Sequence, residues 1–317
     1  MKKIIRFLTR EGIGVFIILV LLFILMSIIS PYFLTVDNIS NLLLQSVFVM
    51  LVSFGMMFVL TAGGIDLSVG SVLGLCGGVT GWFMMMGLNM WLAILLGILL
   101  GALIGAINGF LVTKVKIAPF LVTFSMLTIA RGLLMVATID QPITNFATSS
   151  FEFIAQGYFL GIPMPVWITA IVFILSYFLF NWTSFGRNVV AVGSNEEAAK
   201  LSGVNTDKVK IWVYTLAGVL ASISGIILAS RLTSVQPEMG RSYEMQSIAA
   251  AVVGGTSMSG GKGSIAGTAI GAVILAMVSN ALDLLSVNQF YRMVITGLII
   301  IIAVTVDGLR KSSADTV

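Results

Sequence analysis

"GIGVFIILVLLFILMSII", residues 12–29, is a run of eighteen residues without a charged side chain. A lipid bilayer needs about 20 mostly apolar residues for each helical crossing, so this run predicts a transmembrane helix. The whole chain has the same character, since 58% of its 317 residues are hydrophobic, 9% are charged, and the mean hydropathy is +1.08. The surface of a soluble domain requires much more charge than this. The sequence therefore predicts an integral membrane protein.

A basic N-terminal flank with Lys2, Lys3 and Arg6 gives the first run the look of a signal peptide. Three features argue against cleavage: the run is long for such a peptide, no A-x-A site follows it, and further apolar runs come after it. We expect this segment to remain as the first span.

Apolar runs alternate with polar breaks along the chain, and together they predict an all-α, polytopic transmembrane helical bundle of about ten spans. We expect one transmembrane domain over residues 1–317. The predicted spans are 13–30, 40–61, 67–86, 91–112, 119–138, 164–182, 211–231, 246–258, 265–283 and 290–306, and the eighth of them is short.

The basic residues divide unequally between the two sides that these spans define. With the N-terminus inside, thirteen of the seventeen lie on the inner side, and only Arg131, Arg231, Arg241 and Arg292 lie elsewhere. The thirteen are Lys2, Lys3, Arg6, Arg10, Lys114, Lys116, Arg187, Lys200, Lys208, Lys210, Lys262, Arg310 and Lys311. Because short cytoplasmic loops carry an excess of Lys and Arg, we expect an even number of spans and both termini in the cytoplasm.

Two glycine-rich stretches interrupt apolar runs: "TAGGIDLSVGS" at 61–71 and "VVGGTSMSGGKGS" at 252–264. Irregular backbone at membrane depth is tolerated only where it is buried in protein or lines a cavity, and broken helices often mark a transport path. The candidates for a translocation path are Gly63, Gly64, Asp66, Ser68 and Arg131.

Two of these candidates have a purely structural alternative. Asp66 is an ionisable group within an apolar region, where such groups usually have a role, but it could equally cap the third span. Arg131 could contact the transported solute, or it could snorkel to the interface or form an ion pair. A glycine at every fourth position, 97, 101, 105 and 109, gives one span a smooth face for close helix packing.

The chain has no recognisable catalytic motif. "GGTSMSGGKGS" fails the P-loop spacing, because Thr256 stands where glycine is required and Gly263 where a hydroxyl residue is required. The chain also has no histidine, no zinc-binding motif and a single cysteine, Cys76, so it has no disulfide framework. We expect no enzymatic activity, no cofactor and no nucleic-acid partner, and any ATP must be hydrolysed by another chain.

"SNEEAAKLSGV", residues 194–204, is a polar helical signal within this apolar chain. Ser194 and Glu197 form a potential capping box, Glu196 and Lys200 complement the two ends of a helix, and Gly203 can close it. These features predict a cytoplasmic helix of about two turns. A helix this short needs a surface to lie against, so it is either a connecting loop or a helix that docks into a soluble partner.

The same residues resemble a known family, the permease subunits of ATP-binding cassette (ABC) importers, whose cytoplasmic coupling loop carries an E-A-A…G pattern. "EEAAKLSGV" resembles that loop. "GGIDLSVGS" (63–71), "GRNVVAVGSNEEAAKLSGVNTDKVKI" (186–211), "YTLAGVLASISGIILASRL" (214–232) and "YEMQSIAAAVVGGTSMSGGKGSIAGTAIGA" (243–272) resemble the branch that imports ribose and related monosaccharides. The resemblance covers nearly the whole chain in the same order.

This resemblance implies a bacterial cytoplasmic (inner) membrane protein that works as a homodimer or a paralogous heterodimer. The implied partners are an ATPase subunit with two nucleotide-binding domains and a periplasmic or lipoprotein sugar-binding protein. The coupling loop would extend over about 183–210. The resemblance assigns ATPase coupling to Ser194, Asn195, Glu196, Glu197, Ala198, Ala199, Leu201 and Gly203.

An outside segment, "RLTSVQPEMGRSYEMQ" at 231–246, is unusually charged for this chain. Its Arg231, Glu238, Arg241 and Glu244 are candidates for docking the binding protein, because complementary charges steer transient partners; an ordinary solvated loop is the alternative. The function that we expect is alternating-access import driven by the ATPase. The rival hypotheses are an ion-coupled secondary transporter with Asp66 as its protonatable site, and a passive channel.

Overall fold

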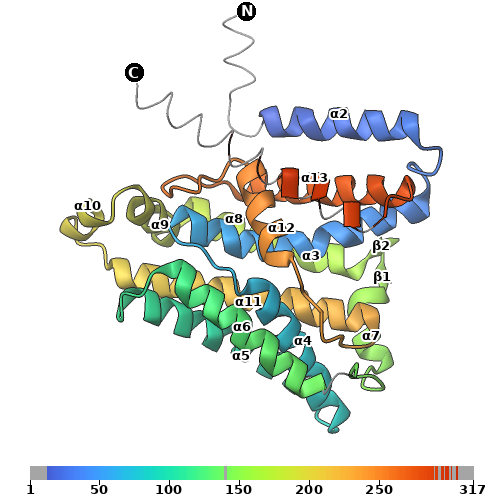
Figure 1. Ribbon diagram of the computed structural model, residues 1–317, viewed down its shortest axis with the longest axis horizontal. Coiled ribbons are helices and arrows are strands. Elements are labelled where there is room, and N and C mark those ends of the chain that lie inside the picture. The colour runs from blue at the N-terminus through green and yellow to red at the C-terminus, as the bar shows by residue number, and fades with distance from the viewer. Residues whose placement is uncertain are drawn as a thin grey trace, which may run out of the picture.

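The computed structural model describes residues 13–138 and 141–288, together with nine residues between 290 and 305. The described part is almost entirely helical (Figure 1). Its helices are α2 (Ile13–Ile29), α3 (Val36–Thr61), α4 (Val69–Met85), α5 (Met90–Thr113), α6 (Pro119–Thr138), α7 (Ser149–Gln156), α8 (Met164–Trp182), α9 (Ser184–Ser194), α10 (Glu196–Leu201), α11 (Thr206–Leu232), α12 (Tyr243–Val253) and α13 (Ile265–Leu284).

Short polar residues set the starts of several long helices. The side chain of Thr35 accepts a hydrogen bond from the amide of Asn38 at the start of α3, and Asn205 and Ser264 cap α11 and α13 in the same way. An oxygen at this position pairs one of the amides that the first helical turn leaves unpaired. These three apolar helices thus begin at residues that the sequence itself marks.

Six helices in the described part are long and apolar enough to cross a membrane: α3, α5, α6, α8, α11 and α13. The predicted spans 13–30 and 67–86 correspond to α2 and α4, which have 17 residues each. The eighth predicted span, 246–258, is the eleven-residue α12, too short for a crossing. The tenth, 290–306, lies largely outside the described residues, as does Arg292. The chain is therefore a polytopic helical membrane protein.

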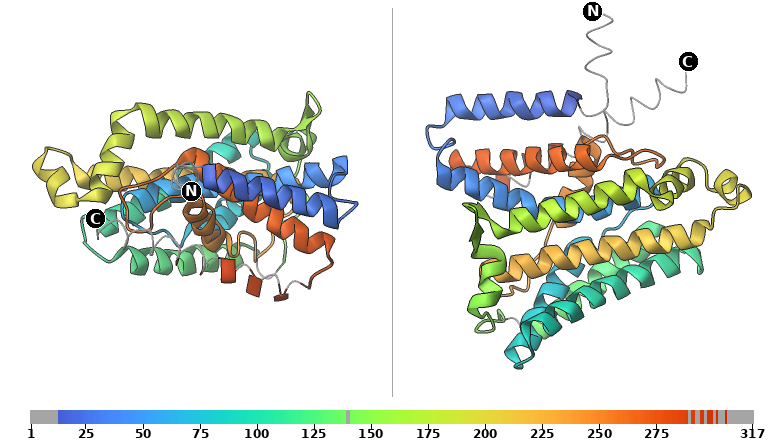
Figure 2. Two further views of the ribbon diagram at one scale, coloured as in Figure 1. Left: turned by 90° about the horizontal axis from the view of Figure 1, so that it is seen from above. Right: turned by 180° about the vertical axis from the view of Figure 1, so that it is seen from behind.

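The long helices lie side by side and run roughly from one end of the molecule to the other (Figures 1 and 2). α9 and α10 lie at one end. α7 and a small antiparallel hairpin, β1 (Tyr158–Phe159) with β2 (Ile162–Pro163), lie at the opposite end. The hairpin and α9 were not expected from the sequence, and the hairpin is a small departure from the predicted all-α fold.

The predicted glycine face belongs to α5 and packs within the same chain, against α11. A side chain in place of Gly101, Gly105 or Gly109 would collide with backbone atoms of Gly218, Tyr214 or Ile211. Without a hydrophobic driving force between helices in lipid, small residues let backbones approach closely and gain packing contacts. α11 is thereby held at the centre of the bundle, between α5, α4 and α3.

Burial separates inner from outer helices. The second half of α3 is almost completely buried, and Phe58, in its last turn, has edge-on contact with Phe180 of α8. α5, by contrast, exposes Leu92, Leu95, Leu99 and Leu103 on the face opposite its glycines. An exposed apolar face of this kind suits contact with lipid, so α3 and α11 form the protein interior and α5 lies at its boundary.

Candidate functional site

The predicted coupling helix is α10, and its first residue has a different cap from the one expected. Asn195 is the N-cap, because its side-chain oxygen accepts a hydrogen bond from the amide of Ala198 over 2.9 Å. Ser194 is the last residue of α9, and its hydroxyl donates to the carbonyl of Val190. The predicted capping box of Ser194 and Glu197 is therefore wrong, because the preceding helix α9 already includes Ser194.

The end of α10 is the one that the sequence predicts. Gly203 has a φ of +86°, its amide donates to the carbonyl of Lys200, and the amide of Val204 donates to that of Ala199. These two bonds close the helix in the left-handed conformation that glycine adopts without strain. The helix has six residues, or about 1.7 turns, in agreement with the helix of about two turns that the sequence predicts. Its last residue, Leu201, is 90% exposed.

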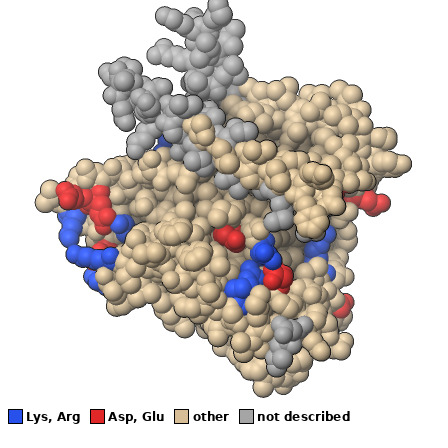
Figure 3. Space-filling view, viewed as in Figure 1, with Lys and Arg blue, Asp and Glu red and all other residues tan. Residues whose placement is uncertain are grey.

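One side of α10 is held against the body and the other is free. Ala199 is buried, and Glu196 forms an ion pair with Lys210 at the start of α11. Lys114, after α5, forms a second ion pair with Asp207 over 2.6 Å. Acidic and basic side chains gather around this end of the molecule (Figure 3). α10 is therefore held in place by Ala199 and Glu196 and exposes the apolar side chain of Leu201 to the surroundings.

Three glycine-containing segments meet beside α9, next to α10. A Cβ atom on Gly193 of α9 would collide with the carbonyl of Thr61 and approach the amide of Gly261, and one on Gly260 would approach Gly63. The amide of Gly261 donates to the carbonyl of Thr61 over 2.9 Å. We call these five residues the glycine junction. It joins both glycine-rich breaks of the sequence to the base of the coupling helix.

The first break, residues 62–68, separates α3 from α4. Gly63 and Gly64 close α3 with φ of +77° at Gly63. Asp66 then accepts hydrogen bonds from the amide and the hydroxyl of Ser68, at 2.9 and 2.6 Å. Ser68 is the N-cap residue of α4, so Asp66 acts at the cap from two residues earlier.

Asp66 is only 1% exposed, because α5, α6 and α11 surround it. Asn108 of α5 donates to the hydroxyl of Ser68, and Tyr214 of α11 donates to the carbonyl of Ile65. Asn108 was not among the predicted site residues. Asp66 is not itself the N-cap that the sequence suggested, because Ser68 holds that position and Asp66 only bonds to it. Contact of Asp66 with a translocation path stays a prediction.

A further irregular segment lies between α11 and α12, where the sequence predicted only an outside loop. It is distinct from the glycine-rich stretch at 252–264, and we call it the second break. Residues 233–242 run back into the molecule, and Thr233, Gly240 and Ser242 take left-handed conformations on the way. α12 then begins beside the start of α4, since a Cβ atom on Gly70 would collide with the carbonyl of Gly240. Both short helices start near the middle of the molecule (Figure 1).

Arg131 of α6 fixes this second break. Its guanidinium donates to the carbonyls of Met239, at 2.7 Å, and Pro237, at 3.2 Å. The carboxylates of Glu238 and Glu244 interact electrostatically with the guanidinium of Arg131. Arg131 thus binds the backbone of another segment, which neither of the alternatives drawn from the sequence included.

Arg131, Glu238, Arg241 and Glu244 form one group, which we call the charged cluster. The sequence assigned Arg131 to the path and the other three to a docking surface, and the fold brings them together. Arg241 forms an exposed ion pair with Glu238 over 2.8 Å, and a carboxylate oxygen of Glu244 is buried without a partner. Charges of both signs also lie near the middle of this face, separated by uncharged surface from those around α10 (Figure 3).

Arg231, the fourth predicted docking residue, does not join the cluster. Its guanidinium carbon lies 5.9 Å from the centre of the Phe48 ring, on a different side of α11. Arg231 differs from the other predicted docking residues in its location along the chain. It lies in the last turn of α11, whereas Glu238 and Arg241 lie in the segment after that helix.

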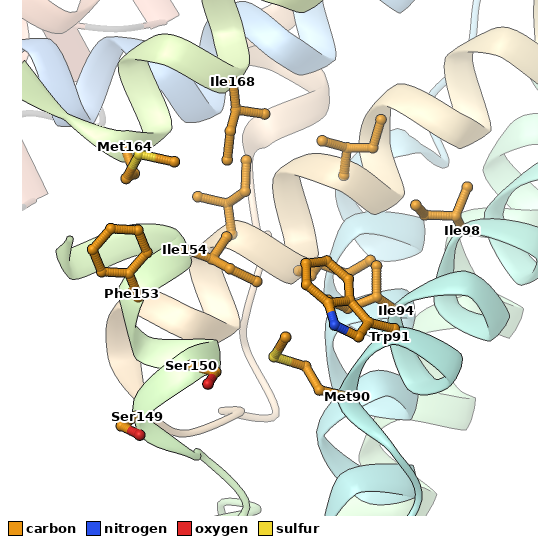
Figure 4. A pocket seen from close by; sticks show the side chains of 13 residues that line it. Met90, Trp91, Ile94, Ile98, Ser149, Ser150, Phe153, Ile154, Met164 and Ile168 are labelled. Atoms are coloured by element: carbon orange, nitrogen blue, oxygen red, sulfur yellow. The ribbon is translucent and has the colours of Figure 1, made fainter. Parts of the chain in front are cut away.

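A cavity of about 700 Å³ lies between α5, α7, α8 and α11. Trp91 and Ile94 of α5 face Phe153 and Ile154 of α7 across it, and the serines 149 and 150 lie near one edge (Figure 4). The lining is otherwise apolar, with few groups that could orient a polar solute. This cavity lacks the convergent polar groups that recognition of a small polar molecule requires.

Comparison with known proteins identifies relatives along nearly the whole chain. The ribose import permease protein RbsC of Bacillus subtilis (strain 168) is 47% identical over 305 residues, which cover 96% of this chain and 94% of that protein. The L-arabinose transport system permease protein AraH of Escherichia coli (strain K12) is 39% identical over 304 residues, covering 96% and 92%. The D-allose transport system permease protein AlsC of the same strain is 37% identical over 298 residues, covering 93% and 91%.

No solved structure matches the chain. The curated relatives confirm the resemblance to permeases of ribose-type importers. Residues 38–304 match the family described as the permease component of branched-chain amino acid transport systems. With a match over this length, and with relatives that align almost from end to end, the chain belongs to that family of transport-system permeases.

Proposed function

We propose that this chain is the membrane-spanning permease subunit of an ABC importer and translocates a monosaccharide, ribose or a related sugar. The observation that carries the proposal is α10, a capped helix with an exposed Leu201, whose base meets the breaks at 62–68 and 252–264 at the glycine junction. A movement of α10 is thereby passed directly to the segments that interrupt the bundle. The ribose, arabinose and allose named for the relatives indicate the class of solute.

The topology we propose has ten spans and cytoplasmic termini. Nine helices up to residue 284 coincide with the first nine predicted spans, and the described residues after 290 are helical. α12 is too short to cross by itself, so the eighth crossing that we propose consists of residues 233–242 together with α12. The lysines and arginines near α9 and α10 then lie in the cytoplasm with the loop at 183–210, where the ATPase would bind.

Two copies of the chain, or this chain and a paralogue, would enclose the path. Arginine or aspartate at the centre of a lipid-facing helix costs about 2.5 to 3.5 kcal/mol on insertion scales. Arg241 and Glu238 of the charged cluster are exposed on the single chain, so the surface that carries them is better accommodated against a second copy or a water-filled path than against lipid. Gly63, Gly64, Asp66, Ser68 and Arg131 remain the proposed path residues.

The mechanism is alternating access. A sugar-loaded binding protein docks on the outer face, with Glu238, Arg241 and Glu244 as proposed contacts, and ATP closes the two nucleotide-binding domains of the partner ATPase. That closure moves α10, and the breaks at 62–68 and 252–264, which meet the end of α9 at the glycine junction, rearrange. ATP and the binding protein drive the change only through their different affinities for the two states. The permease itself performs no covalent chemistry and holds no cofactor in this scheme, and it resides in the bacterial cytoplasmic membrane.

Reconstitution in proteoliposomes tests the proposal. The proteoliposomes contain the permease and the ATPase, the binding protein is added to the outer face of the permease, and ATP is supplied to its cytoplasmic face. Under these conditions, labelled ribose should accumulate on the cytoplasmic side. The permease alone should not accumulate it under a proton or sodium gradient. Accumulation by the permease alone would instead establish the alternative, an ion-coupled secondary transporter.

A further inference from the structure

A second cavity, of about 270 Å³, lies between α3, α11, α12 and α13. It is found toward the end of the molecule that carries α7, because α11 ends and α3 begins there (Figure 1). Polar side chains from all four helices reach it: Gln45, Arg231, Tyr243, Gln246 and Ser279. The ring of Phe48 supplies an apolar wall. We call this the polar cavity.

The polar side chains that line the cavity have no side-chain hydrogen bonds within the described part of the chain. One terminal nitrogen of Arg231 is buried and has no hydrogen-bond partner. No hydrogen bond from the side chains of Gln45, Tyr243, Gln246 or Ser279 is made within the described part of the chain. Buried polar groups are normally paired, and an unpaired one is costly in an apolar environment. One buried, unpaired guanidinium nitrogen and four half-buried polar side chains without hydrogen bonds in the described part of the chain surround one space, and this arrangement points to a ligand.

Arg131 and Arg241 differ from Arg231, because each of them has protein partners that account for its charge. Arg131 donates to two backbone carbonyls, and Arg241 pairs with Glu238. Arg231 has neither kind of partner, and no acidic residue lines the polar cavity within the described part of the chain. Its contact with Phe48, at 5.9 Å, orients the guanidinium but leaves its N–H donors available.

We propose that the polar cavity is a binding site for a single monosaccharide on its way through the permease. This inference rests on the proposed function and adds to it a site on this chain. The hydroxyls of a sugar both donate and accept, which matches two amides, two hydroxyls and a guanidinium. A simple anion only accepts, so it would leave the acceptors of Gln45, Gln246 and Ser279 unpaired. The C–H face of the sugar ring fits the wall formed by Phe48.

The size of the cavity agrees with this assignment. Sites for drug-sized ligands have about 300 to 1,000 Å³, and this cavity is just below that range. A pentose or a hexose is such a small solute, whereas a disaccharide needs more space. The site therefore selects by size as well as by hydrogen bonding.

The test measures labelled ribose binding to the purified permease–ATPase complex without the binding protein, together with uptake by the complete reconstituted importer. Gln246→Ala removes an amide that the fold does not use, so it should fold normally and weaken ribose binding about tenfold, the factor equivalent to about 1.4 kcal/mol. Arg231→Gln should weaken it at least as much. In uptake, both should raise the sugar concentration needed for half-maximal rate.

Gln141→Ala is the matched control, because Gln141 is an exposed glutamine outside the polar cavity. It should change neither measurement. Competition with lactate tests the anion alternative and should not displace ribose. If the wild-type importer takes up ribose while its purified complex binds none, or binds it unchanged after Gln246→Ala and Arg231→Gln, the inference is overturned and the proposed function stands. If the wild-type importer takes up no sugar, the proposed function fails instead.

Discussion

The amide of Gly261 donates a hydrogen bond to the carbonyl of Thr61 over 2.9 Å, joining two loops two hundred residues apart in the sequence. Gly193 lies against the same carbonyl, so the end of α9 closes over this bond. The chain from α10 to the two glycine-rich breaks thus runs through backbone contacts, with no flexible side chain between them. Backbone contacts of this kind transmit displacement, because they leave no space in which it can be absorbed.

Gly193→Ala should disturb this junction. The new Cβ atom would collide with the carbonyl of Thr61, and overpacking of a close contact costs about 1 to 3 kcal/mol. We expect a lower midpoint of thermal unfolding in detergent and weaker coupling of ATP hydrolysis to uptake. Gly132→Ala is the control, because nothing lies within 4 Å of a Cβ atom at that position of α6, and its thermal midpoint should not fall. Equal midpoints for the two variants would remove the argument for close packing at Gly193.

Leu201→Asp should separate the permease from its ATPase. Leu201 is 90% exposed, so the change costs the isolated permease little, but it places a charge where we expect an apolar pocket of the partner. Co-purification with the ATPase and stimulation of ATP hydrolysis should both be lost, while the permease keeps its thermal midpoint. Leu201→Met preserves an apolar side chain and should retain both. Full stimulation in the aspartate variant would exclude α10 as the docking helix.

Replacing Glu197 and Gly203 together tests the same helix from its two ends. Alanine at 203 must take a φ of +86°, which costs about 1 kcal/mol relative to glycine, and loss of Glu197 removes a favourable charge from the first turn. We expect the protein to remain in the membrane with uptake strongly reduced. Survival of both uptake and ATPase stimulation in this double variant would contradict the coupling assignment.

Asp66→Asn distinguishes a structural carboxylate from a proton-coupled one. Asparagine keeps an oxygen that can accept from the amide and the hydroxyl of Ser68, so the start of α4 should be preserved. We expect ATP-driven uptake close to that of the wild type. Asp66→Ala loses the acceptor and should lower stability by about 0.5 to 2 kcal/mol. A loss of uptake in a stably folded Asp66→Asn protein would favour the ion-coupled alternative.

Arg131→Gln should loosen the second break. Hydrogen bonds that involve a charged group contribute about 1.5 to 3 kcal/mol, and Arg131 makes two of them, to the carbonyls of Pro237 and Met239. We expect faster hydrogen exchange in residues 233–242 than in the wild type, with Arg131→Lys in between. Unchanged exchange in both variants would support a side chain that merely reaches toward the membrane interface.

Local signals in the sequence predicted a large part of this fold. Long apolar runs marked the spans, because burying a helix in lipid depends mainly on its own composition and length. Gly203 marked the end of α10, since a left-handed residue is needed there whatever surrounds it. The glycines of α5 marked a close-packed face for the same kind of reason, although their partner α11 could not be named.

Other features depend on how distant segments meet, and no local pattern in the sequence indicates them. The run at 246–258 looked like a crossing, yet it is the short α12, because residues 233–242 first return into the bundle and use part of the available depth. The N-cap of α10 is Asn195 instead of the predicted Ser194, because Ser194 is already the last residue of the preceding helix α9. Hydropathy alone does not detect either effect.

Composition, span length and the closing glycine act within a few turns of chain, so local patterns were enough to predict a polytopic membrane protein with a short polar helix between two of its spans. Long-range packing brings Arg131 to the segment after α11, Gly193 to Thr61 and Gly261, and Arg231 to a polar cavity. These pairings join residues far apart in sequence, and they depend on which helices pack together. Every apolar helix in a bilayer meets an equally apolar solvent, so hydrophobicity does not choose its neighbours; close packing and polar contacts do.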